Sequence, residues 1–257
     1  MLTTEEFYDQ LSQFYDVMND WSARLAYEGP FLRQLLEGHS ALSVLDAACG
    51  TGQHALVLKQ WGFLPTGVDA SPRMIHRAQT EASASGLAVR FLVGRFQELP
   101  SLFGPVFDAV LCLGNSLPHV ESSEDLDASL SGMVQVLRPG GLLLLHNLNY
   151  DKRLAEKPRF FKLDSGLLDD REVLVWRMAD YEESTIIFHT ALFQREDGGK
   201  WTVQVHSTAQ RPLLRGDLVD RLHSLGLVNV RAYGNLQGEP FVVSSSGDLV
   251  LAATKPA

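Results

Sequence analysis

An alternation between short apolar runs and longer segments of helical periodicity, extending from Ser43 to Leu148, constrains the fold of this chain most strongly. Near-continuous apolar runs of this length are typical of strands that are buried on both faces of a sheet. The expected strands are SVLDAA (43–48), TGVDA (66–70), VRFLVG (89–94), FDAVLCL (107–113) and LLLLHNL (142–148). Strands that alternate with helices form a parallel sheet covered by helices on both faces. The sequence therefore predicts an α/β fold with a Rossmann-like, mostly parallel sheet.

The segments between these strands carry signals for the ends of helices. Ser71 followed by Pro72 is typical of an N-cap with proline at the first helical position. Ser122 with Asp125 forms a loose capping box at the start of another helix. The Pro-Gly-Gly run at 139–141 is expected to end that helix before the last strand begins.

Beyond Tyr150 the pattern changes to β-rich stretches separated by turn-like segments, as in antiparallel hairpins. We expect residues 151–210 to form an inserted antiparallel β-sheet subdomain that serves as a lid, an acceptor site or an interface. The main domain would then consist of residues 1–150 and 211–257, closed by a helix at 216–225 and strands near 228–233 and 248–254.

The charge of the chain argues against a nucleic-acid partner. The formal net charge is −9 over 257 residues, so a polyanion would be repelled unless a local basic patch outweighed that charge. The densest basic group is expected to be the solvated face of a connecting segment, and it comprises Lys152, Arg153, Lys157, Arg159 and Lys162. A small-molecule substrate is the expected partner, and self-association into a homo-oligomer stays open.

The sequence also predicts a cytoplasmic protein with no membrane partner. No apolar run approaches the roughly 20 residues that would span a bilayer, and the first ten residues are acidic where a secretory signal would be basic. The two cysteines, Cys49 and Cys112, fall in expected strands or strand ends, where cysteine commonly acts as a small buried hydrophobe.

The segment VLDAACGTGQHA, residues 44–55, is the most informative for function because it combines a buried strand, an acidic residue, a glycine turn and a helix start. Gly50 and Gly52 would let the backbone approach a ligand closely, and the helix presents free N–H groups at its start. Dinucleotide-binding domains begin similarly, but their fingerprint needs three glycines. Asp46 would also repel a pyrophosphate, whereas it favours an ammonium group such as that of a methionine moiety.

A second acidic residue, Asp69, ends the next strand 23 positions after Asp46 and is expected to point into the same crevice. A carboxylate there can accept bonds from both ribose hydroxyls, although capping of the following helix beside Ser71 is the alternative. The adenine ring would lie near the next strand ends, at Ala70, Met74, Gly94, Arg95 and Phe96.

These motifs resemble those of class I S-adenosylmethionine-dependent methyltransferases, with DAACGTG as the cofactor loop and GVDAS as the ribose-binding strand end. The resemblance implies S-adenosyl-L-methionine as cofactor and S-adenosyl-L-homocysteine as product. It assigns cofactor contacts to Asp46, Ala47, Ala48, Gly50 and Gly52 in the loop. Relatives often carry a polar residue such as Asp after the third strand, where this chain has Arg95, so backbone groups near Phe96 are expected to replace that contact.

The runs CLGNSLPH and RPGGLLLLHNLNYD are similar to glycine/sarcosine N-methyltransferases. That similarity implies that Asn149 faces the acceptor and that Leu113, Gly114 and Asn115 border the cofactor. In the family an N-terminal segment folds over the cofactor, so Tyr15 is expected to close the pocket and to help orient the acceptor. Arg24 would pair with the methionine carboxylate, and packing in an aromatic core is the alternative for this segment.

Three further side chains are candidates near the reaction centre. His119 and His146 each follow a strand-end motif and are the best-placed histidines for acid–base chemistry, although a structural role is the alternative for both. Arg211 is a candidate for binding an acidic acceptor. The eight histidines show no spacing that would assemble a metal site, so no metal is expected.

The sequence therefore predicts an enzyme that methylates a small molecule, most simply an amine by direct SN2 transfer with the acceptor held in line. Three alternatives stay open. They are a small-molecule O-methyltransferase with a histidine base, an NAD-dependent oxidoreductase, and a binding protein that keeps the cofactor pocket without catalysis.

Overall fold

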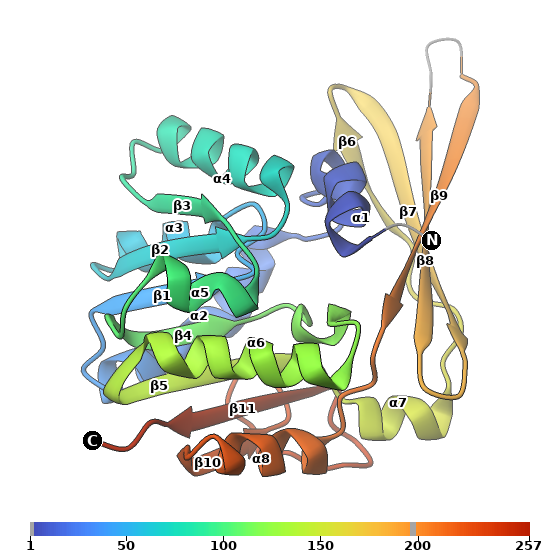
Figure 1. Ribbon diagram of the computed structural model, residues 1–257. Coiled ribbons are helices and arrows are strands. Elements are labelled where there is room, and N and C mark those ends of the chain that lie inside the picture. The colour runs from blue at the N-terminus through green and yellow to red at the C-terminus, as the bar shows by residue number, and fades with distance from the viewer. Residues whose placement is uncertain (1–2, 196–198) are drawn as a thin grey trace.

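The computed structural model describes residues 3–195 and 199–257, which contain two separate β-sheets (Figure 1). The larger sheet has seven strands in the order β10-β11-β5-β4-β1-β2-β3. Its strands are β1 (Ser43–Ala47), β2 (Leu64–Asp69), β3 (Arg90–Val93), β4 (Phe107–Cys112), β5 (Leu137–Leu148), β10 (Val228–Tyr233) and β11 (Asp248–Thr254). The first five run parallel, and β11 is antiparallel to both β5 and β10. The predicted mostly parallel sheet is confirmed.

Helices cover both faces of the large sheet, as predicted. Figure 1 shows α6 in front of the sheet and α2 and α3 behind it. The helices are α1 (Thr4–Leu11), α2 (Trp21–Gly38), α3 (Gln53–Gln60), α4 (Pro72–Ala84), α5 (Leu99–Leu102), α6 (Ser123–Val136), α7 (Tyr150–Glu156) and α8 (Arg215–Ser224). Three single turns of 3-10 helix are η1 (Ser12–Phe14), η2 (Phe96–Glu98) and η3 (Leu117–His119).

The helix starts follow the capping signals in the sequence. Ser71 caps α4, with its hydroxyl accepting a bond from the Met74 N–H at 3.1 Å, and Ser122 caps α6 in the same way through Asp125. The end of α6 differs from the expected arrangement. The helix stops at Val136 and β5 begins at once, so the Pro-Gly-Gly run lies inside the irregular first part of that strand rather than in a connecting loop.

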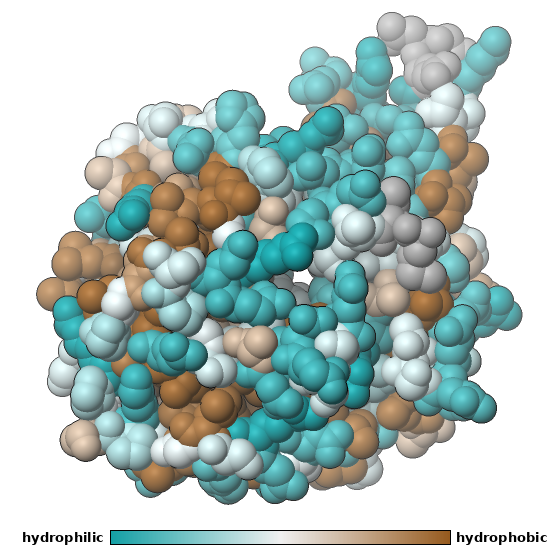
Figure 2. Space-filling view, viewed as in Figure 1, coloured by the Kyte–Doolittle hydropathy of each residue, from teal (hydrophilic) through white to brown (hydrophobic). Residues whose placement is uncertain are grey.

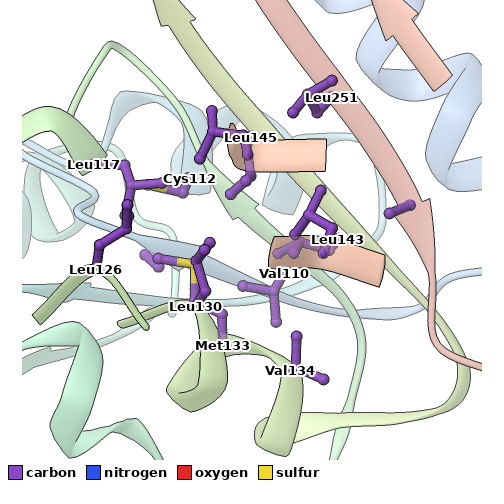
Figure 3. Close-up of a cluster of buried hydrophobic side chains, with 14 of the residues drawn as sticks. Val110, Cys112, Leu117, Leu126, Leu130, Met133, Val134, Leu143, Leu145 and Leu251 are labelled. Atoms are coloured by element: carbon purple, nitrogen blue, oxygen red, sulfur yellow. The ribbon is translucent and has the colours of Figure 1, made fainter. Parts of the chain in front are cut away.

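The main core lies between α6 and the central strands. Figure 3 shows Leu126, Leu130 and Met133 of the helix directed toward side chains of the sheet. Leu143 and Leu145 of β5 are fully buried, as expected for a strand covered on both sides. This packing holds the carboxyl ends of the parallel strands rigidly at one edge, where open α/β sheets bind ligands.

The smaller sheet consists of four antiparallel strands in the order β6-β7-β8-β9. These are β6 (Asp164–Leu168), β7 (Arg171–Tyr181), β8 (Ile186–Arg195) and β9 (Trp201–Gln210). The predicted antiparallel insertion is thus present, although it begins with the helix α7 rather than a hairpin. Figure 1 shows this sheet standing beside the carboxyl edge of the large sheet, with α1 between the two.

The helix α1 joins the two parts of the molecule through an apolar cluster. Its Phe7 and Leu11 pack with Val173, Val175 and Leu192 of the smaller sheet. One face of the smaller sheet is therefore buried toward the large sheet and its strand ends. No helix in the described part of the chain combines the length and apolar character needed to cross a membrane.

Candidate functional site

The turn between β1 and α3 has the backbone geometry of a ligand cradle. Ala48, Gly50 and Gly52 all have positive φ angles, of 63°, 54° and 82°. Such angles strain a residue with a side chain, so their presence at Ala48 marks a turn that the surrounding structure enforces. The two glycines differ in purpose. A Cβ at Gly52 would lie 2.8 Å from the Phe91 ring, which assigns Gly52 to packing, whereas a Cβ at Gly50 would lie 3.6 Å from the Tyr15 ring, an ordinary contact distance.

The side chain of Asp69 links this turn to the start of α4. One carboxylate oxygen accepts a bond from the Gly50 N–H at 2.8 Å, and the other accepts one from the Ser71 N–H at 2.9 Å. Burial raises the pKa of Asp69 to about 6, even though both of these bonds favour the ionised form. Each oxygen keeps lone-pair capacity, so the same carboxylate can fix the turn and accept bonds from a ligand.

The other predicted acid, Asp46, is buried beneath the turn with one oxygen, Oδ2, lacking a hydrogen-bond partner. Burial raises the pKa of Asp46 to about 6, while the charges of His54 and Arg24 act in the opposite direction. A buried carboxylate oxygen without a partner is costly, and a cationic ligand group nearby would offset that cost. The Oδ2 atom of Asp46, which lacks a hydrogen-bond partner, is the observation that best fits a ligand with a cationic methionine end.

A group of charged side chains lies behind this acid. Glu28 of α2, almost fully buried, pairs with Arg24 at 3.2 Å and with the ring of His54. The guanidinium of Arg24 also lies 4.9 Å from the centre of the Trp21 ring. Arg24 is therefore held in one position at the predicted methionine end of the site.

The first cavity in this region, of about 260 Å³, lies over the carboxyl ends of β1, β2 and β3. Its walls include nine of the predicted cofactor contacts, namely Tyr15, Ala48, Gly50, Asp69, Ala70, Met74, Gly94, Arg95 and Phe96. The Arg95 guanidinium pairs with Glu5 at 2.9 Å, and the Arg95 N–H donates to Glu98. The structure thus brings the ribose and adenine candidates together in one slot.

A second cavity of about 590 Å³ adjoins the first and lies between the strand ends and the smaller sheet. Figure 2 shows a hollow between these two parts of the surface. Tyr8, Tyr15 and His119 line both cavities, so these three side chains form the junction between them. Arg24, Gly114, Asn115 and His146 line the second cavity, next to its shared wall.

His119 is held by two hydrogen bonds at this junction. Its Nε2 lies 2.9 Å from the Tyr8 hydroxyl and 3.1 Å from the amide nitrogen of Gln210. Burial lowers the pKa of His119 to about 4, so the ring is neutral at physiological pH. A neutral ring of such low basicity, with Nε2 facing two donors, is poorly suited to remove a proton from a hydroxyl.

The neighbouring Asn115 belongs to the same network. Its side-chain oxygen accepts a bond from the Leu148 N–H at 3.0 Å, and its amide lies 3.1 Å from the Tyr150 hydroxyl. The Tyr150 hydroxyl donates in turn to Gln210 at 2.7 Å. The network therefore fixes the loop after β4 against the last strand of the smaller sheet.

His146 is also constrained by its neighbours. Its Nδ1 accepts a bond from the Gly114 N–H at 3.2 Å, and its Nε2 lies 3.6 Å from a carboxylate oxygen of Asp248. With Nδ1 accepting, the proton of the neutral ring belongs on Nε2, which is the tautomer that faces the carboxylate. The ring thus orients the loop at Gly114 and offers no free lone pair to the cavity.

Five other predicted residues do not line either cavity: Asp46, Ala47, Gly52, Leu113 and Arg211. Asp46 and Ala47 lie beneath the turn in β1, and Leu113 is buried with its carbonyl bonded to the Ser116 hydroxyl. The Arg211 N–H donates to the Pro118 carbonyl at 2.7 Å, which fixes the chain where the smaller sheet ends.

Asn149 also lies away from both cavities. Its side-chain oxygen accepts a bond from the Lys152 N–H and caps α7, while its amide donates to the carbonyls of Val243 and Ser246. Both ends of the amide are therefore occupied by backbone groups. The structure assigns Asn149 to the support of a loop, whereas Asn115 lines the second cavity.

The sequence did not single out the basic residues of the second cavity. Arg153, Lys162 and Arg177 line it on the side of the smaller sheet. Arg153 and Lys162 belong to the group expected to form a solvated face; Lys162 is exposed as expected, whereas Arg153 is half-buried. Arg177 bonds to Asp164 at 2.6 Å and comes from a strand whose pattern shows only alternation, so no sequence signal marked it.

Comparisons with known proteins agree with the geometry. Residues 44–141 match the model of a methyltransferase domain. The glycine/sarcosine N-methyltransferase of Parasynechococcus marenigrum is 37% identical over 150 residues, which are 58% of this chain and 53% of the relative. The enzyme of the same name from Aphanothece halophytica is 29% identical over 240 residues, covering 90% of this chain and 83% of the relative.

Among solved structures, an S-adenosylmethionine-dependent methyltransferase from Clostridium acetobutylicum has the same fold. It superimposes with a TM-score of 0.79 at 18% identity, covering 97% of this chain and 99% of the other. The chain spans about half the length of the first curated relative that it matches. The predicted resemblance and fold class are both confirmed by these matches.

Proposed function

We propose that the chain is a class I S-adenosylmethionine-dependent methyltransferase that transfers the methyl group of S-adenosyl-L-methionine to the nitrogen of a small-molecule amine, as its similarity to a methyltransferase domain and to glycine/sarcosine N-methyltransferases supports. The observation that carries the proposal is the junction of two cavities at Tyr8, Tyr15 and His119. One cavity contains the cofactor turn, and the other is open for an acceptor. An acceptor nitrogen at this junction would meet the donor end of the cofactor site.

We assign the adenosyl part of the cofactor to the first cavity and its methionine end to the junction with the second cavity, where Arg24 forms part of the wall and Asp46 lies beneath the β1–α3 turn. Asp69 would accept bonds from the ribose hydroxyls, and Met74 and Phe96 would flank the adenine ring. The sulfonium supplies an activated methyl group, so the reaction needs no metal or acyl intermediate. The chain contributes position and exclusion of water, which can lower the barrier by about 7–11 kcal/mol.

The histidines support an amine acceptor over a hydroxyl. An unprotonated amine already has a free lone pair, whereas a hydroxyl must lose its proton to a base. His119 has a pKa lowered to about 4, and the Nδ1 lone pair of His146 is engaged by the Gly114 N–H. Neither ring is placed to act as a general base. After transfer, the extra proton of the amine would leave to solvent through the second cavity.

The second cavity supports an acceptor that is larger than glycine and carries an anionic group. Its volume of about 590 Å³ falls in the range of sites for drug-sized ligands, roughly 300–1,000 Å³. Arg153, Lys162 and Arg177 would bind a carboxylate or phosphate by charge-assisted bonds. Phe161 and Phe188 supply apolar walls. Glycine and sarcosine, the substrates named for the curated relatives, would leave most of this space unfilled.

A labelled-methyl transfer assay tests the proposal. Purified enzyme would be incubated with labelled S-adenosyl-L-methionine and a panel of amines, with and without a carboxylate or phosphate, and with hydroxyl compounds of matching size. We expect transfer to the anionic amines. Transfer to the hydroxyl compounds alone would contradict N-methylation, and cofactor binding without transfer to any acceptor would favour a binding protein.

The anionic group is tested separately with Arg177→Gln. This variant should raise KM for an anionic amine about tenfold or more and leave KM for a neutral amine unchanged. Arg171→Gln is the matched control, because Arg171 is exposed at the start of the same strand and lines neither cavity. Equal effects of Arg177→Gln on both amines would contradict the anionic acceptor.

We place the enzyme in the cytoplasm as part of the same proposal. Cys49 and Cys112 are buried and free, which suits a reducing compartment. Measurement of the protein in fractionated cells would test this location.

A further inference from the structure

The smaller sheet carries apolar side chains on both of its faces. Its inner face packs on α1 through Val173, Val175 and Leu192. Alternate residues of β7, β8 and β9 point to the opposite side. We call this side the outer face and define it by Leu174, Trp176, Phe193, Trp201, Val203 and Val205. Cross-strand pairing brings them together, because Val203 pairs with Phe193 and Phe193 pairs with Leu174. Residues on neighbouring strands at paired positions point to the same side.

The outer face is open to solvent in the single chain. Val203 and Val205 are each 57% exposed and Trp201 is 41% exposed. Phe160, which is 60% exposed, stacks on Trp176 with 5.6 Å between ring centres and extends the same surface. Figure 2 shows apolar side chains along the margin of the molecule where β9 lies. A contiguous apolar surface of this kind in a soluble domain marks an interaction site.

The charges around the outer face are already neutralised within the chain. Arg195 pairs with Glu172 at 3.2 Å, at one end of the strands. At the other end Asp180 pairs with Arg159 at 3.0 Å and with His189 at 3.1 Å. The chain as a whole carries −9, yet this face presents no excess of either sign. A surface without net charge does not repel a second copy of itself, so an isologous contact is compatible with these charges.

The area also suits self-association. The strand β7 has 11 residues and extends about 37 Å, while four strands at about 4.8 Å spacing cover about 19 Å. The face therefore offers roughly 600–700 Å² per copy, since β6 is shorter than the other strands. Two copies would bury about 1,200–1,400 Å², which reaches the range of specific protein interfaces.

We propose that the outer face is the contact of a symmetric homodimer, in which the smaller sheets of two copies pack face to face. Two antiparallel sheets packed in this way form the layered arrangement of a β-sandwich, with the apolar side chains of both removed from water. The opposite side of each sheet carries Thr190 and Gln210, which line the acceptor cavity. The dimer contact thus braces a wall of the cavity from outside.

Sedimentation equilibrium of the purified full-length protein tests the proposal between about 1 and about 100 µM, a range in which interfaces of this size associate. We expect a mass of about 57 kDa, twice the 28.4 kDa of one chain. The double variant Val203→Glu/Val205→Glu should sediment as a single chain, because it would bury four carboxylates in the contact. Both positions are exposed, so the fold of the chain should survive the change.

Thr202→Glu/Gln204→Glu is the matched control. Thr202 and Gln204 are exposed on the same strand but point to the opposite side, so this variant should remain a dimer at the concentrations of the wild type. Far-UV circular dichroism should be the same for all three proteins. A wild type that is a single chain throughout, or an outer-face variant that dimerises as well as the control, would overturn the proposal. If the outer face binds a different protein rather than a second copy of this chain, the wild type would sediment as a single chain at all concentrations, which overturns the proposal.

Discussion

Replacement of Asp46 by asparagine should stabilise the ligand-free protein and weaken cofactor binding at the same time. Asp46 is 1% exposed, and its Oδ2 has no hydrogen-bond partner. Ionisation of a carboxyl group at this position is unfavourable unless a cation is bound beside it. The amide of asparagine has nearly the same shape as the protonated acid and carries no charge. The variant therefore removes the cost in the free protein together with the attraction for a cationic ligand.

The magnitude follows from the pKa. Burial raises the pKa of Asp46 from 3.8 to about 6, a difference of about 2 units, and each unit corresponds to about 1.4 kcal/mol. The folded protein binds the proton of Asp46 more tightly than the unfolded chain does. Below pH 4 both states carry this proton, and the free energy of unfolding keeps its full value. The stability that the proton contributes is lost as pH rises through about 6. At pH 8 the asparagine variant should be more stable by about 3 kcal/mol, and near pH 4 the difference should vanish.

Scanning calorimetry of the ligand-free proteins measures this difference. At about 2–4 °C per kcal/mol, Asp46→Asn should raise Tm by about 6–12 °C at pH 8 and leave it nearly unchanged at pH 4.5. Titration calorimetry at pH 8 should show an affinity for S-adenosyl-L-methionine that is at least about tenfold lower. A variant that is less stable at pH 8, or that binds the cofactor as tightly as the wild type, would refute the reasoning.

Asp108 provides a control of the opposite sign. It lies at the other end of the strands, where it accepts bonds from the N–H groups of Leu42 and Ser43 and pairs with Arg138. These bonds lower the pKa of Asp108 to about 2, so its ionised form contributes stability above pH 4 that is lost as pH falls toward 2. Asp108→Asn should therefore lower Tm at pH 8 and leave cofactor affinity unchanged.

Three further predictions concern the turn, the ribose site and the acceptor. Gly52→Ala should lower the free energy of unfolding by about 2–4 kcal/mol in urea titrations, because the new Cβ would lie 2.8 Å from the Phe91 ring at a φ of 82°. Gly62→Ala is the control: its φ is also positive but the space around it is open, so it should lower the free energy of unfolding by about 1 kcal/mol. Asp69→Ala should weaken binding of S-adenosyl-L-homocysteine about 100-fold by calorimetry, through loss of two charge-assisted bonds. His119→Gln should retain amine methylation within about tenfold at pH 7–9 in the transfer assay, and a loss above about 100-fold would identify a base.

The parts of the site that were predicted from the sequence depend on local chain geometry. Asp69 and Gly50 lie at the ends of consecutive elements, and the order strand, turn, helix dictates that both face the same edge of a parallel sheet. Ser71 before Pro72 fixed the start of α4 for a similarly local reason. In each case the neighbours in the chain determine where the side chain lies.

The placement of Asn149 shows where local reasoning fails. Both Asn115 and Asn149 follow a strand of the main sheet, so both were candidates to face the acceptor. Their backbones differ: Asn115 has a φ of 65° and turns toward the cavity, while Asn149 has a φ of −73° and becomes the N-cap of α7. The choice is made by the loop at Val243 and Ser246, whose carbonyls need the Asn149 amide. That loop lies about 95 residues away in the chain, beyond the reach of any local pattern.

The acceptor side of the site is built from contacts of this long-range kind. Tyr8 meets His119 across 111 positions, and Gln210 meets Asn115 across 95. Hydrogen bonds between such distant segments form only once the large sheet and the smaller sheet have both folded, and the N-terminal helix has docked between them. The cofactor turn needs only the large sheet. Local motifs therefore identify the methyl donor. The shape and charge of the acceptor cavity depend instead on how the smaller sheet is held. We therefore expect the outer face of that sheet and the network at His119 to influence which acceptor is used.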